Sequence, residues 1–140
     1  MLTLSSQFSF SPYTNIHIHL HSCSVIFIED SWGYKFGVYV AHALENRSEY
    51  YGNGESFVFT VAPELKKYPW TGDNNMFIMS SSKTLVVGGG GDGFSLQLDD
   101  ELDTGISARS ATYNNATLSS GEFFRCLNCE VWNLDQLAFV

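Results

Sequence analysis

The 140-residue sequence has few basic residues, few cysteines and no long apolar run, and each shortage excludes a class of protein. It has 7 Lys and Arg against 15 Asp and Glu, and its formal net charge is −8. A nucleic-acid-binding domain needs basic patches for the phosphates, so this balance excludes that class and favours a basic protein surface or a cation as partner. No apolar stretch approaches the ~20 residues that cross a bilayer, so no transmembrane segment is predicted.

The cysteines are too few for a disulfide scaffold, and their odd number, 3, is typical of a protein in a reducing compartment. Cys126 and Cys129 form a C-x-x-C pair in a stretch that alternates like a strand. Residues three apart on a strand point to opposite faces, so we expect one thiol to face inward and the other outward. A zinc ribbon would need a second such pair, and a redox pair normally opens a helix. The pattern therefore favours strand packing over redox or metal chemistry.

The residues that are plentiful predict a single β-rich domain. Hydrophobic residues make up 44% of the chain and aromatic residues 15%, which is globular material with a β preference. Short alternating runs predict strands at residues 25–30, 34–41, 55–61, 76–80, 83–87, 94–99 and 123–134. Strands of this kind pair into a two-sheet antiparallel β-sandwich, a mainly β (α+β) fold. The predicted core contains Phe57, Phe59, Leu96, Leu98 and Trp132.

The stretch "KTLVVGGGGDGFSLQLDD", residues 83–100, matches G-x-G-x-x-G at Gly88, Gly90 and Gly93. A dinucleotide site needs a helix after these glycines, whereas the residues that follow alternate like a strand. The glycines are therefore predicted to form a turn between two strands, with left-handed backbone and no bound phosphate or cofactor.

Three further patterns allow a ligand or a modification, each with a simpler explanation. His17, His19 and His21 alternate on one strand face and could bind a metal, but no Cys or carboxylate lies nearby in sequence, and an edge strand is favoured. Asp99, Glu101 and Asp103 alternate as in a calcium loop, yet Gly105 is misplaced and no closing Glu follows, so a solvated turn is favoured. Asn46 and Asn115 lie in N-x-S/T sequons, which matter only if the chain is a secreted sandwich.

Several short motifs, taken in order, resemble the TLDc domain of eukaryotes. The matching stretches include "YYGNGESFVF", "YPWTGDNN", "VVGGGGDGFSLQLDDEL" and "CEVW". Two positions depart from the usual pattern, where Gln97 replaces a common Trp and Asn133 replaces a Gly. The motif residues are predicted to shape turns and core, and they are Gly52, Gly54, Glu55, Phe57, Trp70, Thr71, Gly72, Asn74, Gly88, Gly90, Gly93, Asp99, Leu102, Glu130 and Trp132.

The resemblance implies a TLDc-like domain over residues 25–134, after an unmatched leader at 1–24 and before a tail at 135–140. It also implies a few flanking helices. The implied function is a non-catalytic interaction module in oxidative-stress resistance that binds the vacuolar-type proton pump (V-ATPase) or acts in vesicle trafficking. No catalytic residue, metal or cofactor is implied. The implied location is intracellular, in the cytoplasm or at endolysosomal or vesicle membranes, with the mitochondrion and the nucleus as alternatives.

Five acidic residues are the candidates for contact with a protein partner: Asp73, Asp99, Asp100, Glu101 and Asp103. The alternative function is a thiol-dependent peroxide-handling enzyme that uses Cys126 or Cys129. Such an enzyme requires a thiolate of lowered pKa, and only Arg125 supplies positive charge nearby in sequence.

Overall fold

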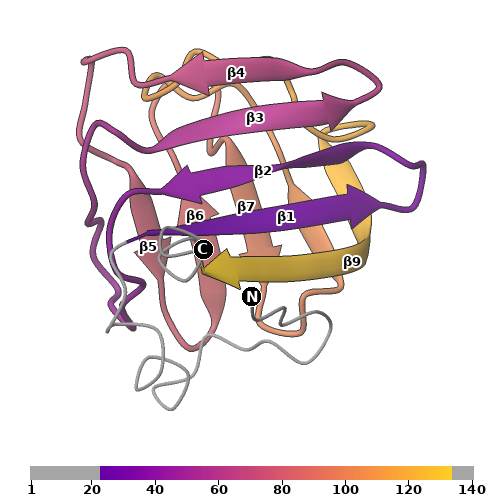
Figure 1. Ribbon diagram of the computed structural model, residues 1–140, viewed down its shortest axis with the longest axis horizontal. Coiled ribbons are helices and arrows are strands. Elements are labelled where there is room, and N and C mark those ends of the chain that lie inside the picture. Colours follow the sequence, from indigo (N-terminus) through magenta and orange to yellow (C-terminus); the bar gives the residue numbers. More distant parts are fainter. Residues whose placement is uncertain (1–22, 134–140) are drawn as a thin grey trace, which may run out of the picture.

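The computed structural model describes residues 23–133, which form nine β-strands (Figure 1). The strands are β1 (Ser24–Asp30), β2 (Lys35–Val40), β3 (Phe57–Ala62), β4 (Lys66–Pro69), β5 (Ile78–Ser80), β6 (Thr84–Val87), β7 (Leu96–Asp99), β8 (Thr104–Ile106) and β9 (Phe123–Asn133). Between residues 23 and 133 there is no helix, and hence none that is long and apolar enough to cross a membrane.

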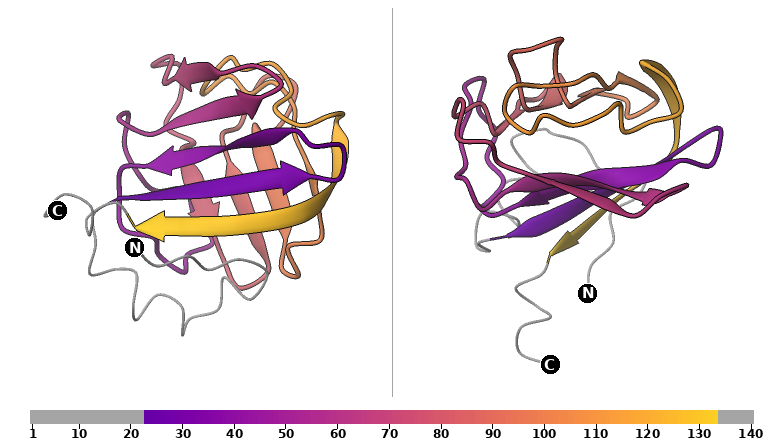
Figure 2. Two further views of the ribbon diagram at one scale, coloured as in Figure 1. Left: turned by 45° about the vertical axis from the view of Figure 1, so that its right-hand side comes forward. Right: turned by 90° about the horizontal axis from the view of Figure 1, so that it is seen from above.

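The strands form one antiparallel sheet in the order β4-β3-β2-β1-β9-β8-β7-β6-β5. Strand β9, with 11 residues, pairs with β1 over its later part and with β8 over its first residues. It curves between the two, so that β1–β4, here called the front half, face β5–β8, the rear half (Figure 2). The mainly β, antiparallel prediction is confirmed. Two separate sheets and flanking helices are not, because the long β9 joins both halves and the described range contains strands only.

The core lies between the two halves and is filled by alternate residues of each strand. On β1 the buried positions are the even ones, with Ile26 and Ile28 both at 0% exposure. Leu96 and Leu98 on β7 face them from the rear half and are also fully buried, as predicted. Hydrophobic burial of this kind, at roughly 25 cal/mol per Å² of apolar surface, is the main force that holds the halves together.

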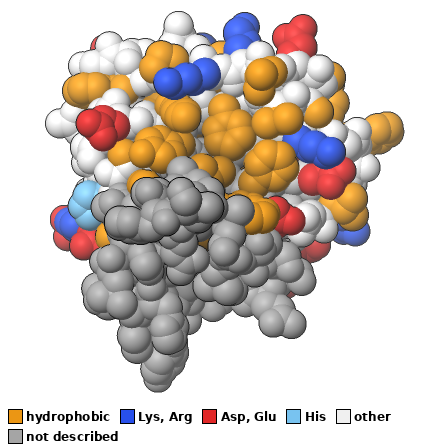
Figure 3. Space-filling view, viewed as in Figure 1, with side chains coloured by type: hydrophobic (Ala, Val, Ile, Leu, Met, Phe, Trp, Pro, Cys, Tyr) orange, Lys and Arg blue, Asp and Glu red, His pale blue; other side chains and the backbone are white. Residues whose placement is uncertain are grey.

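Three of the predicted core residues, Phe57, Phe59 and Trp132, are instead only half-buried on the outer face. The alternation of Phe57 and Phe59 is real, but Val58 takes the inward position of β3. Aromatic side chains are as plentiful on the outer face as inside, so the sequence could not tell which face is the core. Figure 3 shows the apolar side chains gathered over the front half, where the Phe57 ring lies 5.1 Å from Tyr39 and 6.2 Å from Phe59.

Two strands were not predicted, and both are short. Strand β4 reads "KKYP" and forms one edge of the sheet, where lysines and a proline are tolerated because one side of the strand pairs with nothing in the sheet. Strand β8 has only three residues within the stretch predicted as an acidic loop.

Candidate interaction site

The Trp-Thr-Gly-x-Asn motif, residues 70–74, docks onto the glycine loop and the loop 109–115. Asn74 receives hydrogen bonds on Oδ1 from the Thr112 hydroxyl (2.6 Å) and donates from Nδ2 to the Gly89 carbonyl (3.2 Å). The Thr71 hydroxyl donates to the Ala111 carbonyl (2.7 Å). The Trp70 indole donates to the Asn74 carbonyl (2.7 Å), which closes the motif on itself. We call this set of contacts the loop junction.

The glycine loop connects β6 to its antiparallel neighbour β7, as predicted. Gly88, Gly90, Gly91 and Gly93 all have positive φ, the left-handed backbone that glycine adopts without strain. At Gly88 (φ +76°) an added Cβ would lie 2.6 Å from the Ser95 hydroxyl oxygen, so the backbone packs directly on side chains. The loop is filled by the protein's own groups, which agrees with a turn.

Beneath the glycine loop, Ser95, Ser110 and Asn115 form a fully buried polar cluster. The Ser95 hydroxyl donates to Asn115 Oδ1 (2.7 Å), and Asn115 Nδ2 donates to the carbonyls of Ala108 and Ala116. Because the amide of Asn115 is enclosed and paired, its sequon is not accessible to glycosylation in the folded protein. That finding argues against the secreted-sandwich alternative at this position.

Several of the remaining family-motif residues also lie in structural positions. Gly54 packs under the Trp70 ring, where a Cβ would collide with it, and Gly52 packs on Phe77. Leu102 is buried in a left-handed conformation (φ 58°), and Glu130 accepts a hydrogen bond from the Trp132 indole (2.8 Å). Gly72 and Glu55 are exposed. Most of these motifs therefore hold loops in place and do not face a binding cavity.

The predicted partner-contact acids lie at two ends of β7. Asp100, Glu101 and Asp103 are exposed in the turn between β7 and β8, together with the half-buried Asp99. We call residues 99–103 the acidic turn. Asp73 is exposed too, but it lies with the loop junction at the glycine-loop end of β7, so the structure does not bring it to the other four.

Asp99 organises the acidic turn. Its carboxylate accepts hydrogen bonds from the backbone N–H of Asp103 (2.9 Å) and from the Thr104 hydroxyl (2.8 Å). Partial burial raises the pKa of Asp99, but these hydrogen bonds outweigh it, and the net pKa lies below the ordinary value of 3.8. Asp99 is thus ionised at neutral pH, and its carboxylate is used to hold the turn together.

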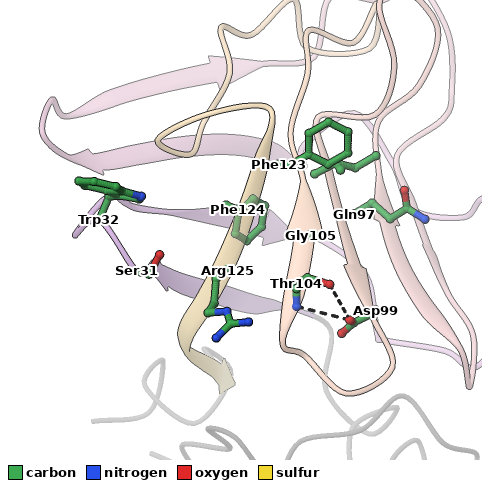
Figure 4. A pocket seen from close by; sticks show the side chains of 10 residues that line it. Ser31, Trp32, Gln97, Asp99, Thr104, Gly105, Phe123, Phe124 and Arg125 are labelled. Atoms are coloured by element: carbon green, nitrogen blue, oxygen red, sulfur yellow. Dashed lines mark hydrogen bonds between the residues drawn. The ribbon is translucent and has the colours of Figure 1, made fainter.

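The acidic turn borders an open groove of about 580 Å³ on the outer face of the rear half (Figure 4). The β1–β2 turn contributes Trp32 to the groove, and strand β9 contributes Phe123 and Arg125. Trp32 is 80% exposed and Phe123 78% exposed. Sequence reasoning missed this groove, since its residues come from four distant segments. The one available signal was the Trp in the polar turn "SWG", where burial cannot explain an aromatic residue.

Both cysteines of the C-x-x-C pair face the core, so the prediction that they straddle the strand is wrong. The pairing of β1 with β9 skips Leu127, because Glu29 pairs with Asn128 and Asp30 with Cys126. This bulge turns the strand by one residue. Cys129 is 1% exposed and Cys126 packs against the core.

The environment of the two thiols favours their protonated forms. Burial raises the pKa of Cys126 to about 11, helped by the carboxylates of Asp103, Asp99 and Asp30. Burial raises that of Cys129 to about 12. Across residues 23–133 no three His, Cys, Asp or Glu side chains converge as metal ligands would. His17, His19 and His21 lie outside the described residues.

Comparison with known proteins identifies relatives of this chain. The family model of the TLDc domain matches residues 6–135, a range that begins within the segment 1–24. Human oxidation resistance protein 1 is 43% identical over 105 residues, which cover 75% of this chain and 12% of that protein. Human nuclear receptor coactivator 7 is 39% identical over 116 residues (83% and 12%), and its chicken counterpart is 38% identical over 116 residues (83% and 13%). The chain thus spans about an eighth of the length of these relatives.

Proposed function

Because this chain belongs to the TLDc domain family, we propose that it is a non-catalytic interaction module that acts in resistance to oxidative stress. The observation that carries the proposal is the 43% identity to human oxidation resistance protein 1 over three quarters of the chain. We further propose the vacuolar-type proton pump as a partner, as the resemblance to TLDc domains implies.

The surface that supports an interaction role is the acidic turn. Its charges project from the protein at Asp100, Glu101 and Asp103, while Asp99 holds the turn in shape. In a chain with a net charge of −8, such a turn attracts a basic surface over a distance of about 8 Å at physiological salt. Electrostatic attraction of this kind raises the association rate and makes it depend on salt.

The test is to reverse the acidic turn and to measure association with the pump. A variant with Asp100, Glu101 and Asp103 changed to Lys, and Asp99 kept, should recover less of the pump's subunits in a pull-down at low salt. Its recovery should also depend less on salt than that of the wild-type chain. The fold should persist, since exposed charges contribute about 0–1 kcal/mol each.

The matched control is reversal of three exposed acids elsewhere, at Glu49, Glu55 and Glu64, which changes the net charge by the same amount without touching the turn. If this control weakens recovery as much as reversal of the turn, overall charge is responsible and the acidic turn has no specific role. If wild-type chain and turn variant recover equal amounts of pump at every salt concentration, the acidic turn is not the contact.

The alternative, a peroxide-handling enzyme, has less physical support. A thiol with a pKa near 11 or 12 is almost entirely protonated at neutral pH, and peroxide is reduced by the thiolate. Cys129 is also enclosed at 1% exposure. These surroundings favour a packing role for the pair.

A further inference from the structure

The groove of Figure 4 is the outer face of β7, β8 and β9, and the strand register divides its floor into two rows. Gln97 pairs with Ile106, which pairs with Phe123, and these form a mainly apolar row. Thr104 pairs with Arg125 in the adjacent row, where Asp99 bonds to Thr104. The groove thus presents an apolar stripe beside a polar one.

Trp32 stands at the side of the groove on a turn that is held from three directions. The fully buried Asp30 carboxylate accepts hydrogen bonds from the backbone N–H of Trp32 (2.9 Å) and from that of Ser120 (2.8 Å), which lies in a distant loop. Ser31 donates its N–H to the Arg125 carbonyl on β9 (3.0 Å). These hydrogen bonds fix the backbone of the turn without using the indole ring. The position of Trp32 is therefore defined although its side chain is mostly exposed.

An exposed tryptophan and an exposed phenylalanine beside one groove are costly in water and typical of binding hot spots. Trp and Arg are over-represented at the energetic centres of protein interfaces, and this groove holds one of each, Trp32 and Arg125. Within the described part of the chain Arg125 forms no ion pair. An open groove of about 580 Å³ suits the side chains of a peptide segment.

The charge around the groove specifies the partner. The acidic turn adjoins the groove at Asp99, which lines it, and the exposed Asp100, Glu101 and Asp103 follow within four residues, while Arg125 is the single cation among the lining residues. A basic segment therefore complements the acidic turn, and an apolar side chain complements the stripe.

We propose that this groove binds a short basic segment of a protein partner, whose aromatic or long aliphatic side chain packs between Trp32 and Phe123. A neighbouring Lys or Arg of that segment faces the acidic turn. The inference rests on the proposed interaction function, and it adds the apolar contact that the acidic turn alone does not supply.

The test uses a synthetic peptide, Gly-Lys-Lys-Phe-Lys-Lys-Gly, titrated into the isotope-labelled full chain and followed by NMR. We expect signal shifts at the Trp32 indole N–H and at the backbone of residues 104–106 and 123–125. The Trp32→Ala and Phe123→Ala variants should each bind the peptide roughly tenfold more weakly or worse. Both should stay folded, because side chains this exposed contribute little to stability.

The controls separate the apolar from the charged contribution. Leu65→Ala removes an equally exposed side chain (82%) from the β3–β4 turn and should leave the affinity unchanged. A peptide with Ala in place of Phe should bind more weakly, and one with Glu in place of every Lys should not bind. Shifts that spread over the whole acidic surface, or equal affinity of the Trp32→Ala variant, would overturn the proposal.

The pump pull-down distinguishes this proposal from the proposed function. If the Trp32→Ala chain recovers as much pump as wild type while the turn reversal recovers less, the groove proposal falls and the proposed function stands. If the peptide binds in the groove with the expected variant pattern but no pump is recovered by the wild-type chain, the groove proposal stands and the pump is not its partner.

Discussion

The front and rear halves share one antiparallel sheet, but different interactions hold them together. Strands β1 to β3 of the front half have six or seven residues, and their ladders and buried side chains suffice to define them. Strands β5 to β8 have three or four residues each and are joined by loops that bond to one another through Asn74, Thr112 and Ser95. Short strands are marginal alone, so the rear half depends on its loops. The glycine loop and the Trp-Thr-Gly-x-Asn motif both belong to this network of loops.

The largest loss of stability is expected from a substitution at the contact between the front half and strand β9. Phe36 on β2 is fully buried, and its ring meets that of Phe124 on β9 edge to face, with centroids 5.2 Å apart. Phe36→Ala should lower the free energy of unfolding by about 3–5 kcal/mol, because it removes a large buried ring and leaves a cavity. Urea unfolding measures this loss. Phe123→Ala, one residue from Phe124 but 78% exposed, should change it by no more than about 0.5 kcal/mol. Similar losses in both variants would mean that the halves are not joined through this contact.

A smaller and more local loss of stability is expected from a substitution at the loop junction. The Thr112 hydroxyl accepts the Gly89 N–H (3.0 Å) and donates to Asn74 Oδ1. Thr112→Val keeps the shape but leaves these groups without their partner, at a cost of about 1–3 kcal/mol. Amide hydrogen exchange should accelerate in residues 88–93 and 70–74 while the front half stays protected. The exposed Thr117→Val is the matched control, and equal acceleration in β1 and β2 would contradict the division into halves.

The smallest expected change in stability comes from the two cysteines of the shared strand β9, and it appears only at alkaline pH. The pKa of Cys129 is raised from 9.0 to about 12 on folding, so the unfolded chain loses this proton first. The stabilisation from the buried neutral thiol is complete below pH 9 and is lost as pH rises toward 12. At pH 10 the loss should be roughly 1 kcal/mol for Cys129, with a further contribution from Cys126 in the same direction.

A Cys126→Ala/Cys129→Ala chain provides the comparison for this pH effect. Chemical unfolding at pH 8, 9 and 10 should show a shallower decline of stability than in the wild-type chain. Tyr51 and Tyr113 also have pKa values raised by burial, so some decline above pH 10 should persist in both chains. Parallel declines would show that the thiols do not change their proton affinity on folding.

Sequence patterns predicted the features that depend on the local alternation of residues. They failed for the features that depend on pairing between strands far apart in the sequence. The alternation of residues 94–98 and the left-handed glycines after β6 were predictable because both are local. The orientation of Cys126 was not, since it depends on one bulge opposite Asp30 of another strand. The exposure of the acidic turn followed from its composition. The groove beside Trp32 did not, because β1 and β9 must pair before its walls meet.

Strand β9 also determines when the protein can fold during its synthesis. Among the strands between residues 23 and 133, the first to be synthesised, β1, is the sheet neighbour of the last, β9, and within the sheet β9 joins the front half to the rear half. Until residues 123–133 leave the ribosome, β1 and β8 each expose an unpaired edge. Contacts between strands so far apart in sequence slow folding, and open edges invite pairing with other chains. The exposure of these two edges ends when the eleven residues of β9 pair with both strands and close the sheet.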